Sequence, residues 1–186
     1  MVRTSLTEPL QIAEICTFPN FGRIGITFCP GKKDKFSLRG SWDRDLATDL
    51  AVIKAWGAAT IVTLIEAHEF ELLKVEALGD EIRARHMDWA HLPILDVSVP
   101  DTRFEAAWLK VGEALRAQLC DGANVIVHCR GGLGRAGTIA ARLLVELGTM
   151  GPEEAIARVR AVRPSAIETL AQENHVRNCG PVPRTS

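Results

Sequence analysis

The sequence contains no tyrosine, no Cys-x-x-Cys pair, no long apolar run and no excess of either charge. Lys and Arg total 22 and Asp and Glu total 23, so the net charge is −1. This balance provides no overall attraction to nucleic acid or to an anionic membrane surface. We therefore expect neither a nucleic-acid partner nor a membrane partner, and any affinity for anions must be local.

The cysteines argue against both a disulfide framework and a zinc site. They are five in number and widely spread, at Cys16, Cys29, Cys120, Cys129 and Cys179. An odd, dispersed set is typical of a reducing compartment. The N-terminus lacks a basic start followed by an apolar stretch, and the most apolar region, 50–65, is interrupted by Lys54 and Gly57. These features predict a soluble, cytoplasmic protein.

No internal repeat, low-complexity tract or linker divides the chain. We expect residues 1–186 to form a single domain and a monomer, with 1–20 and 180–186 loosely ordered. Short apolar runs rich in β-branched residues predict buried strands, which we place at 24–28, 60–65, 89–92 and 124–127.

Helical periodicity alternates with these strands. Apolar residues three to four positions apart predict helices at 46–53, 104–119 and 139–147, then one opened by Pro152 and one over 168–178. Asp101 is placed to cap the second of them. Strands that alternate with helices indicate an α/β sandwich with a largely buried sheet.

The stretch HCRGGLGRAG, residues 128–137, contains two incompatible motifs. From Gly132 the pattern is Gly-x-Gly-x-x-Gly, as in dinucleotide-binding turns. From Cys129 it is a cysteine, five residues and Arg135, as in a loop that wraps one phosphate. The dinucleotide motif requires a following strand with an acidic residue about 20 positions on, whereas 151–164 predicts another helix. The pattern therefore favours the phosphate loop.

Each residue type in the loop suits attack on a phosphate. Cys129 lies between a strand and a helix, where backbone N–H groups and the helix dipole favour the nucleophilic thiolate. Arg135 can bind two phosphate oxygens with its planar fork. His128 is expected to orient the loop and support the thiolate, although it can equally be a buried strand-end histidine. The phosphate-binding set is Arg130, Gly131, Gly132, Leu133, Gly134 and Arg135; positive φ values at its three glycines would turn N–H groups inward.

The loop is accompanied by FCPGKK (28–33), HLPILD (91–96), VPD (99–101) and PEEAIARVRAVRPSAIETLAQ (152–172). Together they resemble, in order and over most of the chain, the cysteine-dependent protein phosphatases of the dual-specificity branch. The resemblance implies a three-layer protein-tyrosine-phosphatase-like fold, with a central mixed sheet flanked by helices and a phosphate loop between a strand and a helix. It implies hydrolysis through a cysteinyl-phosphate intermediate, with no cofactor and no metal.

The leaving group must be protonated by an acid from a neighbouring loop. Asp96 matches the family acid in the Pro-Ile-x-Asp segment, and Asp101 is the rival. Because capping explains Asp101, we favour Asp96, which would otherwise be a loop aspartate that binds backbone N–H groups.

Two positions bear on breakdown of the intermediate. After the arginine the family usually carries Ser or Thr, whose hydroxyl stabilises the departing thiolate; here that residue is Ala136. Thr138 is not an obvious substitute. Either breakdown is slowed, or another hydroxyl or a water takes this role. Gln172 matches a family position that orients the attacking water, and it can also be structural.

Other residues carry weaker expectations. Without tyrosine, the aromatic candidates for a substrate pocket are Phe36, Trp42 and Phe70, which can equally be core residues, and we predict a shallow, less selective pocket. Two interpretations of Lys32 and Lys33 remain open. Either they add positive potential at the mouth of the pocket, or they are solvated side chains of an exposed turn. Arg130 selects among substrates or is merely exposed.

Cys29 lies near the expected site and is either a small apolar side chain or a redox partner of Cys129. The histidines outside the loop, His68, His86, His91 and His175, show no metal-ligand spacing.

The sequence thus predicts a phosphatase that acts on phosphorylated proteins, at phosphotyrosine, phosphoserine or phosphothreonine. Two alternatives remain. The same chemistry suits phosphoinositide, nucleotide or RNA 5′ phosphates, and a weakly active phosphoprotein-binding module would retain the loop without turnover.

Overall fold

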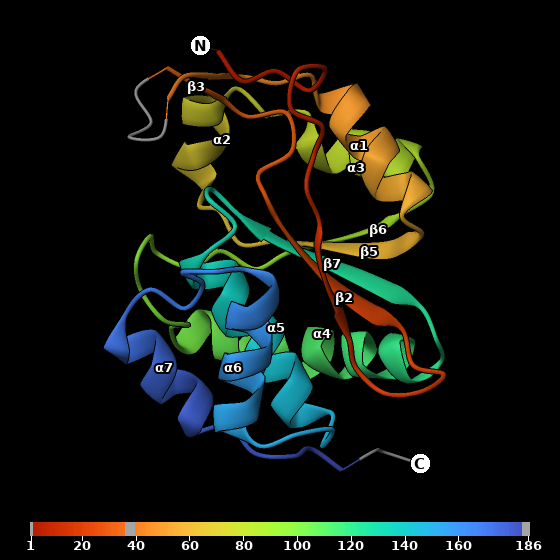
Figure 1. Ribbon diagram of the computed structural model, residues 1–186, viewed down its shortest axis with the longest axis vertical. Coiled ribbons are helices and arrows are strands. Elements are labelled where there is room, and N and C mark those ends of the chain that lie inside the picture. Colours follow the sequence, from red (N-terminus) through yellow and green to blue (C-terminus); the bar gives the residue numbers. More distant parts are fainter. Residues whose placement is uncertain (1, 36–39, 184–186) are drawn as a thin grey trace.

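A five-stranded sheet divides the molecule into two helical layers (Figure 1). The structure, a computed structural model, describes residues 2–35 and 40–183. The strands lie in the order β1 (Ala13–Cys16), β2 (Arg23–Phe28), β7 (Asn124–Cys129), β5 (Ala58–Thr63) and β6 (Asp88–His91). Only β1 is antiparallel to its neighbour; β2, β7, β5 and β6 run parallel. The predicted mixed sheet flanked by helices is confirmed.

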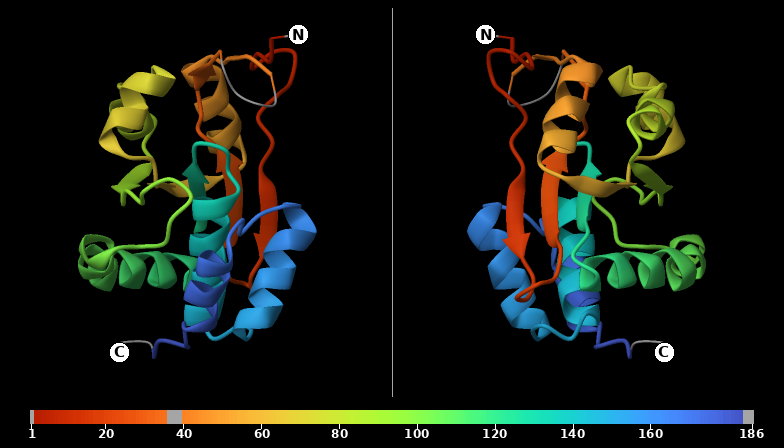
Figure 2. Two further views of the ribbon diagram at one scale, coloured as in Figure 1. Left: turned by 90° about the vertical axis from the view of Figure 1, so that its left-hand side faces the viewer. Right: turned by 90° about the vertical axis from the view of Figure 1, so that its right-hand side faces the viewer.

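The helices divide between the two faces of this sheet (Figures 1 and 2). One face is covered by α1 (Leu46–Ala55), α2 (Ala67–Leu73) and α3 (Leu78–Ala84). The other is covered by α4 (Thr102–Cys120), α5 (Gly134–Glu146), α6 (Pro152–Val162) and α7 (Leu170–Arg177). A small ribbon of β3 (Lys33–Asp34) and β4 (Trp42–Asp43) lies beside α2.

Side chains of the central strand β7 point alternately into the two hydrophobic cores, one on each face of the sheet. Val125 and Val127 pack in the core shared with α4, α5 and α6, whereas Ile126 packs in the core shared with α1 and α3. All three side chains are fully buried. Successive side chains of a strand point to opposite faces, so a strand buried on both faces is apolar at every position, which is why 124–127 is recognisable in the sequence.

All four predicted strands are present, with ends shifted by one or two residues. The sequence did not predict β1, β3, β4, α2 or α3. The two helices have seven residues each, too short for a clear amphipathic pattern. Strand β1 is a half-exposed edge strand of four residues, and it lies inside the segment 1–20 that was expected to be loosely ordered.

The parallel strands place the phosphate loop. Phe28 of β2 and Thr63 of β5 flank the end of β7 at Cys129 and His128. Because parallel strands end at the same edge of a sheet, their following loops converge there. The predicted phosphate loop lies at this edge, between β7 and α5.

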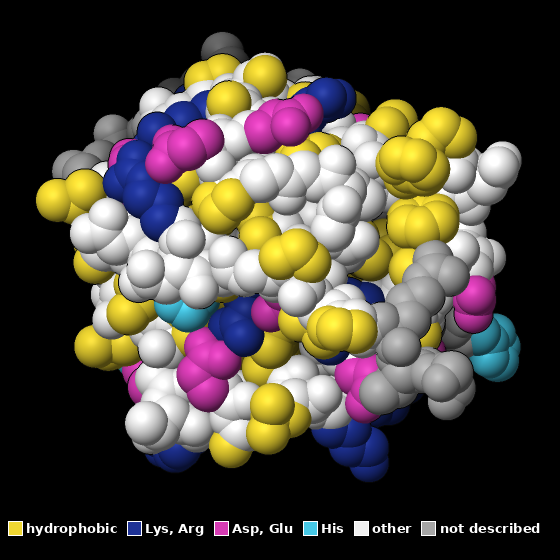
Figure 3. Space-filling view, turned by 90° about the horizontal axis from the view of Figure 1, so that it is seen from below, with side chains coloured by type: hydrophobic (Ala, Val, Ile, Leu, Met, Phe, Trp, Pro, Cys, Tyr) yellow, Lys and Arg dark blue, Asp and Glu magenta, His cyan; other side chains and the backbone are white. Residues whose placement is uncertain are grey.

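Within residues 2–35 and 40–183, no helix combines the length and apolar character needed to cross a membrane. On the face seen from below, basic and acidic side chains lie beside one another (Figure 3), as the near-zero net charge suggests.

Candidate active site

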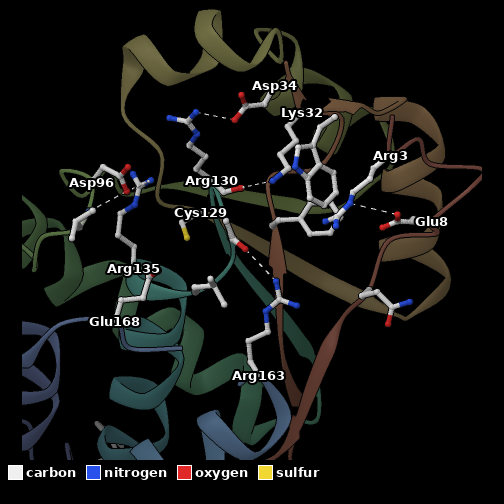
Figure 4. Close-up of a pocket in the computed structure, with 16 residues that line it drawn as sticks. Arg3, Glu8, Lys32, Asp34, Asp96, Cys129, Arg130, Arg135, Arg163 and Glu168 are labelled. Atoms are coloured by element: carbon white, nitrogen blue, oxygen red, sulfur yellow. Dashed lines mark hydrogen bonds and ion pairs between the residues drawn. The ribbon is translucent and has the colours of Figure 1, made fainter. Parts of the chain in front are cut away.

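Cys129 lies at the end of β7 in a pocket of about 590 Å³. Cys129 is buried, and Arg135, which follows after five intervening residues, lies in the first turn of α5. The charged residues that line the pocket are Arg3, Glu8, Lys32, Asp34, Asp96, Arg130, Arg135, Arg163 and Glu168 (Figure 4). Within the described residues, no three His, Cys, Asp or Glu side chains gather as a metal site.

The glycines of the loop differ in what they do. Only Gly132 has a positive φ, at 66°, and a Cβ there would lie 2.5 Å from the carbonyl oxygen of Thr27. The expectation of positive φ at Gly131 and Gly134 is wrong. A Cβ at Gly134 would lie 2.4 Å from the exposed carboxylate of Glu168, which can move away, and 2.9 and 3.0 Å from the side-chain amide of buried Gln172, whereas at Gly131 nothing lies within 4 Å of the Cβ position. Close packing therefore requires glycine at position 132, favours it at 134 because of Gln172, and does not require it at 131.

Arg135 is held by a glutamate that the sequence analysis missed. Its Nη1 and Nη2 donate to Glu69 Oε2 and Oε1 at 2.6 and 2.9 Å, and both side chains are at most 2% exposed. Burial disfavours the charged form of both side chains, but their paired hydrogen bonds outweigh it. The pKa of Arg135 is therefore raised above its usual value, and the pKa of Glu69 is lowered below its usual value. Arg135 also donates to the carbonyl of Ile94. The guanidinium is therefore fixed and charged before any ligand binds.

The structure separates the two candidate acids. Asp96 lines the pocket, and its Oδ1 lies 2.8 Å from Arg135 Nη2 and accepts from the N–H of Val97 at 3.0 Å. Asp101 caps α4 by accepting from the N–H of Phe104 at 2.8 Å. The predicted cap is confirmed, and Asp96 alone of the two belongs to the pocket.

His128 is deeply buried and hydrogen-bonds through Nε2 to the hydroxyl of Thr63 at 2.7 Å. Burial lowers its pKa to about 4. The imidazole is therefore neutral near pH 7, so it adds no positive charge beside the sulfur of Cys129, and its bond to Thr63 joins the ends of β7 and β5.

This burial predicts a specific loss of stability in acid. Between pH 6.5, the usual pKa of histidine, and pH 4, the unfolded chain binds a proton that folded His128 excludes. The free energy of unfolding should fall over this range by about 3 kcal/mol on account of His128. Urea unfolding of the natural protein and of His128→Gln, followed from pH 7 to pH 4.5, measures this. Equal slopes in the two proteins would contradict the prediction.

Other predicted site residues lie outside the pocket or act structurally. The Thr138 hydroxyl donates to the carbonyl of Gly134 within its own helix at 2.8 Å, so it does not replace the hydroxyl missing at Ala136. Gln172 is fully buried, donates to the carbonyl of Ser98 and accepts from the N–H groups of Glu168 and Thr169. It caps α7 and joins this helix to the loop that contains Asp96.

The structure also shows where the three cationic candidates, Arg130, Lys32 and Lys33, lie. Arg130 Nη2 lies 2.8 Å from Asp34 Oδ2. Lys33 is exposed and pairs with Asp43, but Lys32 is 5% exposed and burial lowers its pKa to about 8. The expectation that Lys32 is simply solvated is therefore wrong.

Among the aromatic candidates, Trp42 lines the pocket. Phe70 packs against Trp89 and His91, and Phe36 lies outside the described residues. Cys29 is completely buried, and burial raises the pKa of its thiol.

Comparisons with known proteins place the chain among phosphatases. A family model, the Swiss Army Knife protein DSP-PTPase phosphatase domain (PTP-SAK), matches residues 34–176. Human cyclin-dependent kinase inhibitor 3 is 32% identical over 155 residues, which cover 82% of this chain and 69% of that protein. Human protein tyrosine phosphatase type IVA 3 is 32% identical over 126 residues, covering 67% and 66%.

Solved structures show the same similarity. Kinase associated phosphatase (KAP), crystallised with its catalytic site cysteine substituted by serine, matches with a TM-score of 0.78 and 28% identity, over 91% of this chain and 93% of that one. Tk-PTP in its active form matches with a TM-score of 0.64 and 25% identity, over 87% and 92%.

Proposed function

Because this chain belongs to the DSP-PTPase phosphatase family, we propose that it hydrolyses phosphomonoesters on proteins through a cysteinyl-phosphate intermediate on Cys129. The observation that carries the proposal is the pocket in which Cys129, Arg135 and Asp96 meet. A nucleophile, a fixed cation and an acid are the three groups that this chemistry requires. A module that only binds phosphate needs neither the nucleophile nor the acid.

In the first step the Cys129 sulfur attacks phosphorus, and the bond to the leaving oxygen breaks while Asp96 supplies its proton. Arg135 and the loop N–H groups stabilise the charge on the equatorial oxygens. In the second step water, deprotonated by Asp96, attacks the phosphorus of the thiophosphoryl group. Phosphate leaves, and the Cys129 thiolate is regenerated.

Asp96 must change partners during this cycle. Its Oδ1 contacts Arg135 Nη2, so a phosphate that binds this guanidinium through Nε and Nη2 competes with Asp96 for Nη2. Release from Arg135 makes the carboxyl available to the leaving oxygen. Half of its side chain is exposed, which leaves room for this movement.

We further propose that the chain acts as a cytoplasmic monomer that needs no metal or cofactor. A phosphorylated protein is the substrate we favour over phosphoinositides or nucleotides, since the relatives named above are protein phosphatases or associate with a kinase by name. The pocket contains Trp42 and no tyrosine. We therefore infer that it accepts more than one phosphorylated side chain.

Hydrolysis of a defined substrate panel in excess chelator tests this function. We expect release of phosphate from phosphotyrosyl and phosphothreonyl peptides alike, with kcat/KM values within about tenfold of each other, because the loop recognises the phosphate itself. Phosphatidylinositol phosphates and nucleoside monophosphates should be poorer substrates. Activity confined to phosphotyrosyl peptides, or highest on the lipids, would contradict the proposal.

A further inference from the structure

Three consecutive carbonyl oxygens of the phosphate loop accept hydrogen bonds from cationic side chains far away in the sequence. Lys32 Nζ donates to the carbonyl of Arg130 at 3.2 Å. Arg163 donates through Nε to the carbonyl of Gly132 at 3.0 Å and through Nη2 to that of Gly131 at 3.1 Å. We propose that Lys32 and Arg163 are positioning residues, which hold the loop N–H groups toward the phosphate.

The geometry of the peptide bond connects these contacts to the site. In a trans peptide the C=O of one residue and the N–H of the next point in opposite directions. Fixing the carbonyls of residues 130, 131 and 132 therefore fixes the N–H groups of Gly131, Gly132 and Leu133. In Figure 4 the bonds drawn from Lys32 and Arg163 leave the loop on the side away from Arg135 and Asp96. The N–H groups that follow the bonded carbonyls therefore point away from Lys32 and Arg163.

The loop needs such support because packing alone does not hold it. Gly132 is restrained by its close approach to Thr27, but at Gly131 the position of a Cβ has no neighbour within 4 Å. A glycine in open space can rotate its peptide planes at little cost. A rotated carbonyl would point an oxygen at the phosphate and repel it. Arg163 opposes this rotation by binding the carbonyl oxygens of two successive peptides, the one that joins Gly131 to Gly132 and the one that joins Gly132 to Leu133.

Removing Lys32 and removing Arg163 would leave different numbers of loop carbonyls without a hydrogen-bond donor. Lys32 is held with its Nζ 4.0 Å from the ring centroid of Trp42 and 4.9 Å from that of Phe28. The carbonyl of Arg130 also accepts from the N–H of Cys29 at 3.4 Å, so it keeps one partner when Lys32 is removed. Arg163 serves two carbonyls by itself in a forked geometry that lysine cannot reproduce. We expect the larger effect at Arg163.

The inference rests on the proposed function, because it assumes that the loop binds phosphate. The test is the dissociation constant of inorganic phosphate, measured by ¹H–¹⁵N NMR titration of the full chain, together with kcat and KM for p-nitrophenyl phosphate. The variants are Arg163→Met, Arg163→Lys and Lys32→Met. Arg158→Met, at an exposed position on α6, and Lys33→Met, at the exposed first residue of β3 next to Lys32, are the matched controls.

We expect Arg163→Met to weaken phosphate binding by about tenfold or more, through the loss of two hydrogen bonds to the loop. Arg163→Lys keeps the charge but reaches one carbonyl, so it should lose most of the same affinity. Lys32→Met should show a smaller loss, and both controls should remain within about twofold, since exposed charges contribute little. The affected variants should also lose the phosphate-induced shifts of the Gly131, Gly132 and Leu133 amides.

Three outcomes would overturn the inference. Unchanged affinity in Arg163→Met would show that the loop holds itself. Full affinity in Arg163→Lys would show that Arg163 acts by charge alone, and this variant decides the question if Arg163→Met does not fold. Absence of phosphate binding by the unmodified protein would overturn the proposed function and this inference with it.

Discussion

Replacing Cys129 by serine is expected to reduce the hydrolysis of p-nitrophenyl phosphate by about 10⁴-fold or more. The sulfur lies between the end of β7 and the first turn of α5, where the loop N–H groups favour an anion. A serine hydroxyl remains protonated in the same place and is a poor nucleophile. Steady-state rates in excess chelator measure the effect. Phosphate should still bind to the variant, because Arg135 and the loop are unchanged.

Two other cysteines supply controls. Cys120→Ser alters a half-buried residue at the end of α4, and we expect full activity. Cys29 is buried beside the site with its thiol pKa raised, so Cys29→Ser should also retain turnover. Loss of activity in Cys29→Ser with a stable fold, or substantial turnover in Cys129→Ser, would place the nucleophile elsewhere.

Replacing Asp96 by asparagine is expected to lower kcat on a phosphothreonyl peptide by about 10²-fold to 10⁴-fold, the usual contribution of a general acid. Asparagine keeps the shape of the side chain but has no proton to give to the departing alkoxide. The loss should be smaller on p-nitrophenyl phosphate, whose leaving group needs less help. KM should not rise, because neutral asparagine competes less with phosphate for Arg135 than Asp96 does.

Asp101→Asn is the matched control for this change. Asp101 caps α4 through its side-chain oxygen, and asparagine is as good a capping residue as aspartate. Its kcat and KM should therefore remain within about twofold of the natural values, since the cap is preserved. The opposite pattern, with activity lost in Asp101→Asn and kept in Asp96→Asn, would assign the acid to Asp101.

The phosphate loop could be predicted because its chemistry is local. The seven residues from Cys129 to Arg135 are contiguous, and the strand before them and the helix after them have clear apolar periods. The predicted reasons were only partly right. Gly134 is favoured by the close approach of buried Gln172 and not by a positive φ, and a contact with a residue more than thirty positions away leaves no local signal.

Residues that support the loop could not be predicted in the same way. Glu69 belongs to a seven-residue helix. In the sequence it cannot be told apart from a glutamate on an ordinary solvent-exposed helix surface. Glu69 also accepts from the N–H of Glu66 at the start of this helix, but its role at the site follows from the buried contact with Arg135. Lys32 was weighed as an exposed lysine, yet it is buried because the rings of Phe28 and Trp42 meet over it. A buried charge depends on partners that sequence patterns do not identify.

The sequence by itself determined the α/β class, the central strands, the cap at Asp101 and the cysteine-to-arginine loop. These features depend on periodicity and on residue types within a few positions of one another. Only the tertiary structure decided that Asp96 faces Arg135, that Gln172 bonds to Ser98, that His128 is neutral, and that Glu69, Lys32 and Arg163 surround the loop. Those properties arise from burial and from contacts between distant segments, which exist only after the sheet and its helices have packed together.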